Sequence, residues 1–151
     1  MRDELTELLD TAIYREIASY AFYTAGQKLT ADPGARAVLK ELAHQELKHS
    51  QWLKELKEKG VQRNRWSGGE IADLKISDYL TGRDSLDNSG IQDVLVFAMK
   101  REQQSLEFYS RMSAAARDEA LKTLCERLVH EEMKHKLRLE TTYDDLFYQE
   151  D

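Results

Sequence analysis

The sequence predicts an all-α protein, a four-helix bundle made of two helical hairpins that one long connection joins. Three observations predict it: few helix breakers, apolar residues at helical spacing, and an internal repeat. The 151 residues include only one proline and seven glycines, and this scarcity permits long helices. The length suits a single domain over residues 1–151 with a core of its own.

Helix ends can be placed from capping residues. Asp32 precedes Pro33, and Asp118 precedes the last long segment; aspartate is a common N-cap, and proline is favoured at the first helical position. Gly60 ends the second helix. The four helices are expected at about residues 3–29, 33–59, 90–116 and 119–147.

The connection between the hairpins is long. Residues 61–88 contain glycines, aspartates and asparagines, and we expect a crossover there with one short helix near residues 71–80. The other two links are tight, so each helix pair forms an antiparallel hairpin. One crossover that runs the length of the bundle gives the up-down-down-up topology of the ferritin-like variant.

Each predicted helix carries an inward stripe of mostly apolar residues, spaced alternately by three and four. Ionisable residues interrupt all four stripes at one level. The interrupting residues are Glu16, Glu46, His49, Glu102, Glu132 and His135.

The two halves of the chain repeat each other. A shift of 86 residues aligns residues 12–49 with 98–135 without gaps, and 12 of the 38 positions are identical. Both halves place a glutamate thirty residues before a Glu-x-x-His motif. The chain is therefore two copies of one helical hairpin, which we expect a pseudo-twofold axis to relate.

This set of residues indicates a dinuclear metal site. Glu and His at i and i+3 share one helix face, and two such pairs with two further glutamates form the ligand set of di-iron or di-manganese bundles. Four buried carboxylates carry four negative charges, which two divalent ions cancel. Without metal, each buried charge costs on the order of several kcal/mol. Carboxylate and imidazole ligands suit iron or manganese.

A second Glu-x-x-His motif, Glu41 and His44, is excluded. Its glutamate has no counterpart in the other half, where Arg127 stands. His44 also lies about 140° around the helix from His49. The same symmetry argument excludes Glu131 as a ligand.

Other residues on the inward stripes can serve either the packing of the core or the metal site. Tyr23 and Tyr109 follow the first glutamate of each half by seven residues, and they are core residues, groups that contact the ligands, or electron relays near the metals. Ser19 and Ser105 either leave room for an oxidant or let the helices approach. Cys125 is expected to be a buried thiol.

Bulk properties exclude several classes. The net charge of −6 offers no basic surface for nucleic acid. With one cysteine, neither an internal disulfide nor a CxxC metal module is possible. The N-terminus lacks a signal-peptide pattern, and no apolar run approaches the roughly 18 residues of a membrane span. We expect a cytoplasmic protein.

With these motifs in view, the chain resembles the rubrerythrin-like branch of the ferritin-like superfamily over nearly its whole length. The carrying segments are REIASYAFY, ELAHQELKH, AMKREQQSLEFY, LVHEEMKH and, in the connection, LKISDYLTG.

The resemblance implies a dinuclear iron site whose six ligands, named above, are also the catalytic groups. Glu16 and Glu102 would be terminal or bridging, Glu46 and Glu132 would bridge or chelate, and each histidine would cap one metal. Rubrerythrins reduce hydrogen peroxide, and related proteins oxidise ferrous iron. Two departures stand out: this chain has no rubredoxin module, so the electron donor would be a separate rubredoxin-like protein, and Ser105 replaces a further glutamate tied to efficient peroxidase activity.

The expected function is therefore an oxidoreductase of the peroxidase or ferroxidase type, with hydrogen peroxide or dioxygen as oxidant and a role in oxidative stress. The cofactor would be two iron ions, with manganese also possible. The chain is expected to form a homodimer. Two alternatives remain open: an iron-binding or storage protein, and a metal-stabilised structural module without turnover. An organic substrate is a further alternative within the enzymatic interpretation.

Overall fold

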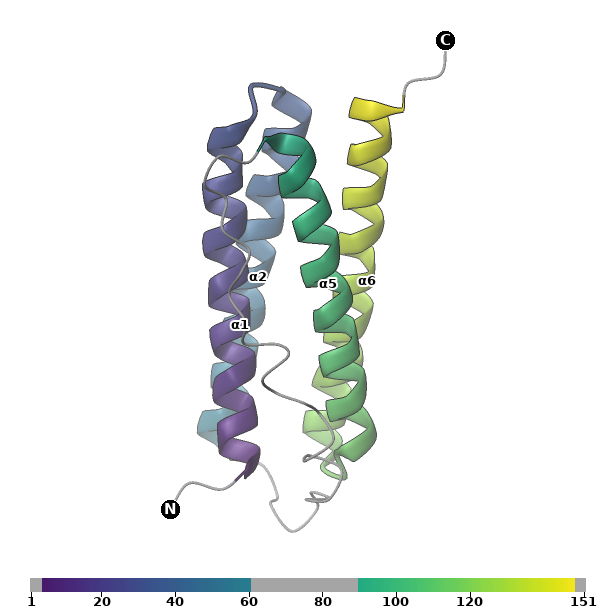
Figure 1. The fold of residues 1–151 in the computed structure, drawn as a ribbon. Coiled ribbons are helices and arrows are strands. Elements are labelled where there is room, and N and C mark those ends of the chain that lie inside the picture. Colours follow the sequence, from purple (N-terminus) through teal and green to yellow (C-terminus); the bar gives the residue numbers. More distant parts are fainter. Residues whose placement is uncertain (1–3, 61–89, 149–151) are drawn as a thin grey trace.

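The computed structural model describes residues 4–60 and 90–148, which form a bundle of long helices (Figure 1). The helices are α1 (Glu4–Gly26), α2 (Pro33–Lys59), α5 (Ile91–Ala115) and α6 (Glu119–Phe147), with a 3-10 turn, η1 (Gln27–Leu29), after α1. The crossover predicted at residues 61–88, with its short helix, lies outside the described residues.

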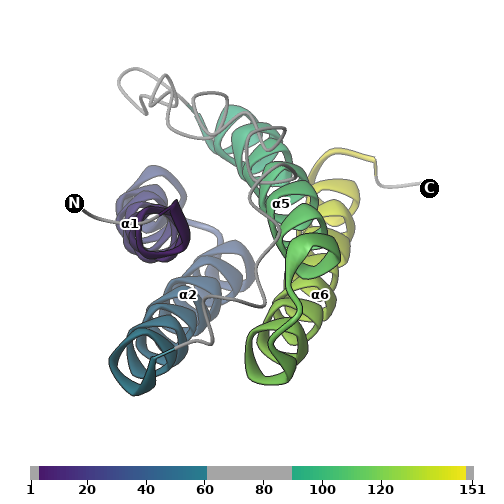
Figure 2. The same cartoon turned by 90° about the horizontal axis from the view of Figure 1, so that it is seen from below.

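The helix directions follow the predicted order of up, down, down, up. α1 packs against α2 and α5 packs against α6 as two antiparallel hairpins. α2 ends at the end of the bundle where α1 begins, whereas α5 begins at the opposite end (Figure 1). Seen along the bundle, α2 and α6 bring the two hairpins together, and α1 and α5 stand further apart (Figure 2).

Both predicted aspartate caps are confirmed. The Asp32 carboxylate accepts a hydrogen bond from the backbone amide of Ala35 at 2.8 Å, and the Asp118 carboxylate accepts one from Leu121 at 3.0 Å. Each cap satisfies an amide that the first turn of the helix leaves unpaired. At the other end of α2, Gly60 has φ 81°, a left-handed value that glycine adopts without strain.

The first helix ends earlier than the sequence predicted. α1 stops at Gly26, and the tighter turn η1 continues to Leu29. A Cβ atom on Gly26 would lie 3.0 Å from Val94 Cγ1 and 3.5 Å from Leu39 Cδ1. The glycine therefore lets α1 approach α5 closely, at the cost of a weaker helix end.

Two apolar clusters fill the bundle on either side of the ionisable level. One contains the buried residues Leu5, Leu8, Leu9, Ala12, Leu53, Leu56, Phe108, Tyr109, Met112, Ala116, Leu121, Cys125 and Leu128. The other contains Phe22, Tyr23, Leu39, Leu42, Ala43, Val94, Leu95, Ala98 and Leu139. Apolar layers at both ends exclude water from the polar groups between them and lower the local dielectric constant.

Charged residues cover the outward helix faces, as in Lys54, Glu55, Lys57 and Glu58 of α2. Within residues 4–60 and 90–148, no helix combines the length and the apolar character that crossing a membrane requires.

Candidate metal centre

The six interrupting residues of the stripes meet in the middle of the bundle. α1 and α5 contribute one glutamate each, and α2 and α6 contribute one Glu-x-x-His pair each. None of the six is more than 4% exposed; they are Glu16, Glu46, His49, Glu102, Glu132 and His135. The structure thus brings together every residue that the sequence predicted as a ligand.

The two histidines reach across between the hairpins. Nδ1 of His49 lies 2.9 Å from Glu132 Oε1, and Nδ1 of His135 lies 2.9 Å from Glu46 Oε1. The glutamates of α1 and α5, called the outer glutamates below, are slightly more distant. Glu16 Oε2 lies 3.6 Å from Nδ1 of His49, and Glu102 Oε1 lies 3.7 Å from Nδ1 of His135. Both imidazoles therefore direct the same ring nitrogen towards the carboxylates.

These atoms form two overlapping groups of four ligands. Each residue of a group offers an atom within 4.8 Å of the others. Glu46 and Glu132 belong to both groups; Glu16 and His49 complete one of them. Glu102 of α5 and His135 of α6 complete the other group.

Several of these buried atoms have no hydrogen-bond partner among the described residues. They are Glu16 Oε2, Glu46 Oε1, Glu102 Oε2, both carboxylate oxygens of Glu132, both ring nitrogens of His49, and His135 Nδ1. A buried polar atom without a partner costs about 1–3 kcal/mol, and a charged one costs more. One divalent cation in each of the two groups can satisfy these carboxylate oxygens, and the oxygen and imidazole ligand atoms suit such cations.

The carboxyl groups divide into two kinds. Burial raises the pKa of Glu46 and of Glu132 well above the ordinary range, and the neighbouring carboxylates raise both further. For Glu16, burial acts in the same direction, but the close approach of His49 and Glu46 outweighs it and lowers the pKa to about 2. The pKa of Glu102 is lowered against burial in the same way, chiefly by the close approach of Glu132 and then of His135. Without a cation, these surroundings favour the protonated form of Glu46 and Glu132 and the ionised form of Glu16 and Glu102.

Tyr23 and Tyr109 are core residues that also contact two of the predicted ligands. Both are fully buried and belong to the apolar clusters. The Tyr23 hydroxyl donates to Glu102 Oε1, and the Tyr109 hydroxyl donates to Glu16 Oε1 at 2.6 Å. Each tyrosine thus orients the outer glutamate of the opposite hairpin.

Two arginines also lie beside the site, and the sequence argument missed their role. Arg15 donates to Ser105 Oγ at 2.9 Å, and Arg101 donates to Ser19 Oγ at 3.2 Å. Both arginines and both serines are identical pairs in the internal repeat, and this was the available signal. The serine hydroxyls therefore link the hairpins.

Each guanidinium also stacks on an aromatic ring. The Arg15 guanidinium carbon lies 5.4 Å from the centre of the Phe108 ring, and that of Arg101 lies 5.2 Å from the Phe22 ring. Such cation–π contacts hold a positive charge beside the buried carboxylates.

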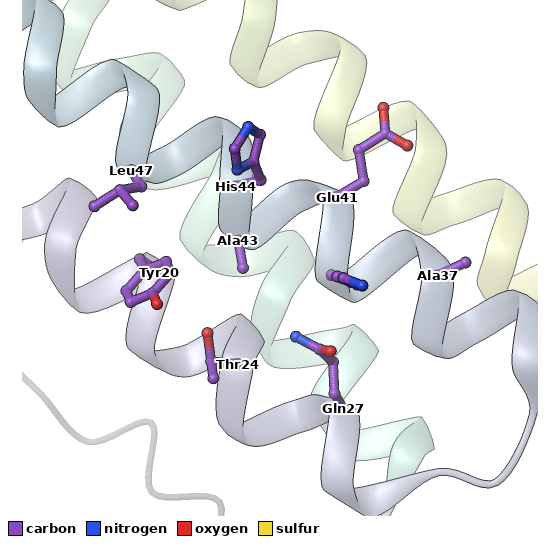
Figure 3. Close-up of a pocket in the computed structure, with 9 residues that line it drawn as sticks. Tyr20, Thr24, Gln27, Ala37, Glu41, Ala43, His44 and Leu47 are labelled. Carbon is purple, nitrogen blue, oxygen red and sulfur yellow. The ribbon is translucent and has the colours of Figure 1, made fainter.

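The second Glu-x-x-His motif lies away from the site, on the outer side of α2. Glu41 and His44 are exposed, and they line an open groove of about 590 Å³ with Tyr20 and Thr24 of α1 (Figure 3). Glu41 forms an ion pair with Arg138 at 2.9 Å. Neither Glu41 nor His44 belongs to the groups of ligand atoms in the core.

Cys125 is a buried free thiol, as the sequence predicts. It lies in one of the apolar clusters, and burial raises its pKa to about 12. A thiol in this state is a poor nucleophile and a poor metal ligand.

Glu131, which the internal repeat excludes as a ligand, lies close to both histidines. It is half-buried, and one carboxylate oxygen lies within 4.8 Å of a ring nitrogen of both His49 and His135. Its place next to Glu132 in the sequence was the only signal.

The site lies in a fold that a solved structure shares. A two-domain protein from Anabaena variabilis, which contains DJ-1/ThiJ/PfpI-like and ferritin-like domains, matches with a TM-score of 0.74 and 16% sequence identity. The match covers 99% of this chain and 42% of that one, so this chain spans less than half of that protein's length. No family model and no curated protein matches the sequence. The likeness shows the fold alone, and that fold is the ferritin-like four-helix bundle which the sequence predicts.

Proposed function

We propose that the protein is a non-haem di-iron oxidoreductase that reacts with hydrogen peroxide or dioxygen. The observation that carries the proposal is the pair of overlapping ligand groups that share Glu46 and Glu132. Two sets of four buried donors with two carboxylates in common suit two adjacent ions, and the four negative charges balance two divalent cations.

Each half of the site would hold one ion. Glu16 and His49 would be ligands of the first ion, Glu102 and His135 would be ligands of the second, and Glu46 and Glu132 are available to both. The ligand type favours iron, and manganese would satisfy the same donors.

Bound at these residues, two ferrous ions would supply the two electrons that, with two protons, are needed to reduce hydrogen peroxide to two waters. The chain's own residues provide the surroundings of that chemistry. The apolar clusters exclude bulk water on both sides of the site. Tyr109 and Tyr23 hold hydroxyl protons at the outer glutamates, where they fix the carboxylate orientation.

The partners follow from this reaction. Every turnover consumes two electrons, and we propose that a separate rubredoxin-like protein returns them. We also propose that the protein is cytoplasmic and that the chain forms a homodimer. Sedimentation of the iron-loaded protein tests the dimer. A large cage instead of a dimer would favour iron storage.

Metal loading and stopped-flow mixing test the proposal. Metal-free protein is titrated anaerobically with Fe(II), and the loaded protein is mixed with peroxide or with oxygen. We expect about two ions per chain and oxidation by at least one of the two oxidants. Glu41→Ala, in the exposed motif, is the matched control and should behave as wild type. Binding of fewer than two ions, or no oxidation by either oxidant within minutes, would overturn the proposal.

A metal-stabilised module without turnover is the second candidate. The helices pack mainly within each hairpin, and the histidine–glutamate contacts of the site join one hairpin to the other. This role predicts a large rise in unfolding temperature on metal binding with no reaction with either oxidant. Oxidation of the loaded site would exclude it.

A further inference from the structure

The two halves of the site differ beside the shared glutamates. Glu131 precedes Glu132 on α6, whereas Gln45 precedes Glu46 on α2. Adjacent residues of a helix point about 100° apart. The Glu131 side chain therefore approaches the histidines from outside the ring of four buried carboxylates, where it is half-buried.

The imidazole orientation leaves one nitrogen of each ring for a further partner. Both Nδ1 atoms face the carboxylates, so both Nε2 atoms point away from them. The rings stack with centroids 5.6 Å apart and planes at 10°. The His49 ring also packs on Trp52 at 5.1 Å, and these contacts fix the direction of its Nε2.

Nε2 of His49 is buried and has no hydrogen-bond partner among the described residues. A neutral imidazole that binds a cation through Nδ1 carries its proton on Nε2, which then needs an acceptor. One oxygen of Glu131 lies within 4.8 Å of a ring nitrogen of this histidine and of His135. With three side-chain torsions and partial exposure, Glu131 can close the remaining distance.

We propose that Glu131 is a positioning residue that accepts the Nε2–H hydrogen bond of His49 and lies within reach of His135. This inference rests on the proposed metal centre. The hydrogen bond fixes the tautomer and makes the imidazole a stronger ligand. Because the counterpart Gln45 carries no charge, the carboxylate also breaks the symmetry of the repeat.

Anaerobic calorimetric titration with Fe(II) tests this role. Loss of such a partner commonly lowers metal affinity about 10–100-fold, and we expect a loss in this range for Glu131→Ala. We expect a smaller loss for Glu131→Gln, since the amide oxygen still accepts a hydrogen bond. Glu126→Ala, an exposed position on the same helix, is the matched control and should bind as wild type does.

A nuclear magnetic resonance measurement reads the hydrogen bond directly. In protein loaded with Zn(II), the Nε2 proton of His49 should exchange slowly with water in the wild type and quickly in Glu131→Ala. Wild-type affinity and slow exchange in Glu131→Ala would overturn the inference. The inference would also fail if Glu131→Ala and Glu131→Gln lost the same metal affinity and the metal-free Glu131→Ala protein unfolded at a lower temperature than the wild type. Absence of metal binding by the wild type would instead overturn the proposed function, so the two failures are distinguishable.

Discussion

Nδ1 of His49, on α2, lies 2.9 Å from Oε1 of Glu132, on α6. The imidazole of one hairpin therefore meets a carboxylate of the other, and the repeat produces the reciprocal contact at the same distance. The site is thus a property of the packed hairpin pair, because neither hairpin contributes more than three of its six groups.

Removing a shared glutamate should have a larger effect than removing an outer one. Glu132 belongs to both ligand groups, whereas Glu16 belongs to one. We expect Glu132→Ala to lose both ions and Glu16→Ala to retain one, because the second group of donors stays intact. Metal analysis after anaerobic Fe(II) loading and desalting measures the ratio. Two ions retained by Glu132→Ala would contradict the shared role.

The stability of the metal-free protein should depend on pH in an unusual direction. Burial raises the folded-state pKa of Glu46 and Glu132 above the ordinary 4.5, so the folded state binds more protons than the unfolded state. Their contribution to the free energy of unfolding is complete below about pH 4.5 and is lost as the pH rises through the raised pKa of the folded state. Glu16 acts oppositely, with a folded pKa of about 2, so its contribution is lost only as the pH falls from 4.5 towards 2.

We therefore expect the free energy of unfolding of the metal-free protein to fall between pH 5 and pH 7. Bound metal should reverse the trend, because protons compete with the cation for the same oxygens. Urea unfolding at several pH values, with a chelator and with added Mn(II), measures both curves. A metal-free curve that rises over this range would show that the shared carboxyls are ionised in the folded state.

Tyr109→Phe should destabilise the metal-free protein. The substitution removes the hydrogen bond to Glu16 Oε1 and leaves a buried acceptor unpaired, which costs about 1–3 kcal/mol. Tyr14 is 61% exposed, so Tyr14→Phe is the control and should change stability by less than about 0.5 kcal/mol. Urea unfolding at pH 7 compares the two variants. Equal effects would mean that the buried hydrogen bond contributes nothing.

Cys125 should be unreactive in the folded protein. Burial raises its pKa to about 12, so almost no thiolate is present near pH 8, and the apolar cluster blocks access. We expect a disulfide reagent to label the native protein only as fast as it unfolds, and to label the urea-unfolded chain within minutes. Rapid labelling of the native protein would show that this cluster opens locally.

Glu46, His49 and Glu131 show which features of the site are local properties of the chain and which depend on helix packing. The stripe that contains Glu46 and His49 could be read because helical spacing is a local property of the chain. The repeat predicts no role for Glu131 as a ligand, whereas the structure places its carboxylate close to both imidazoles. That closeness depends on how α2 and α6 are rotated against each other, which no local pattern encodes.

By itself, the sequence determined four helices in two repeated hairpins, the capping aspartates, and the six ionisable groups at one level of the core. Periodicity and repetition are sufficient for these features, because they place residues on a face and mark equivalent positions. Only the tertiary structure decided which groups meet across the hairpins: Tyr23 with Glu102, and Arg15 with Ser105. These contacts join residues about eighty to ninety positions apart, and they depend on the separation and rotation of packed helices.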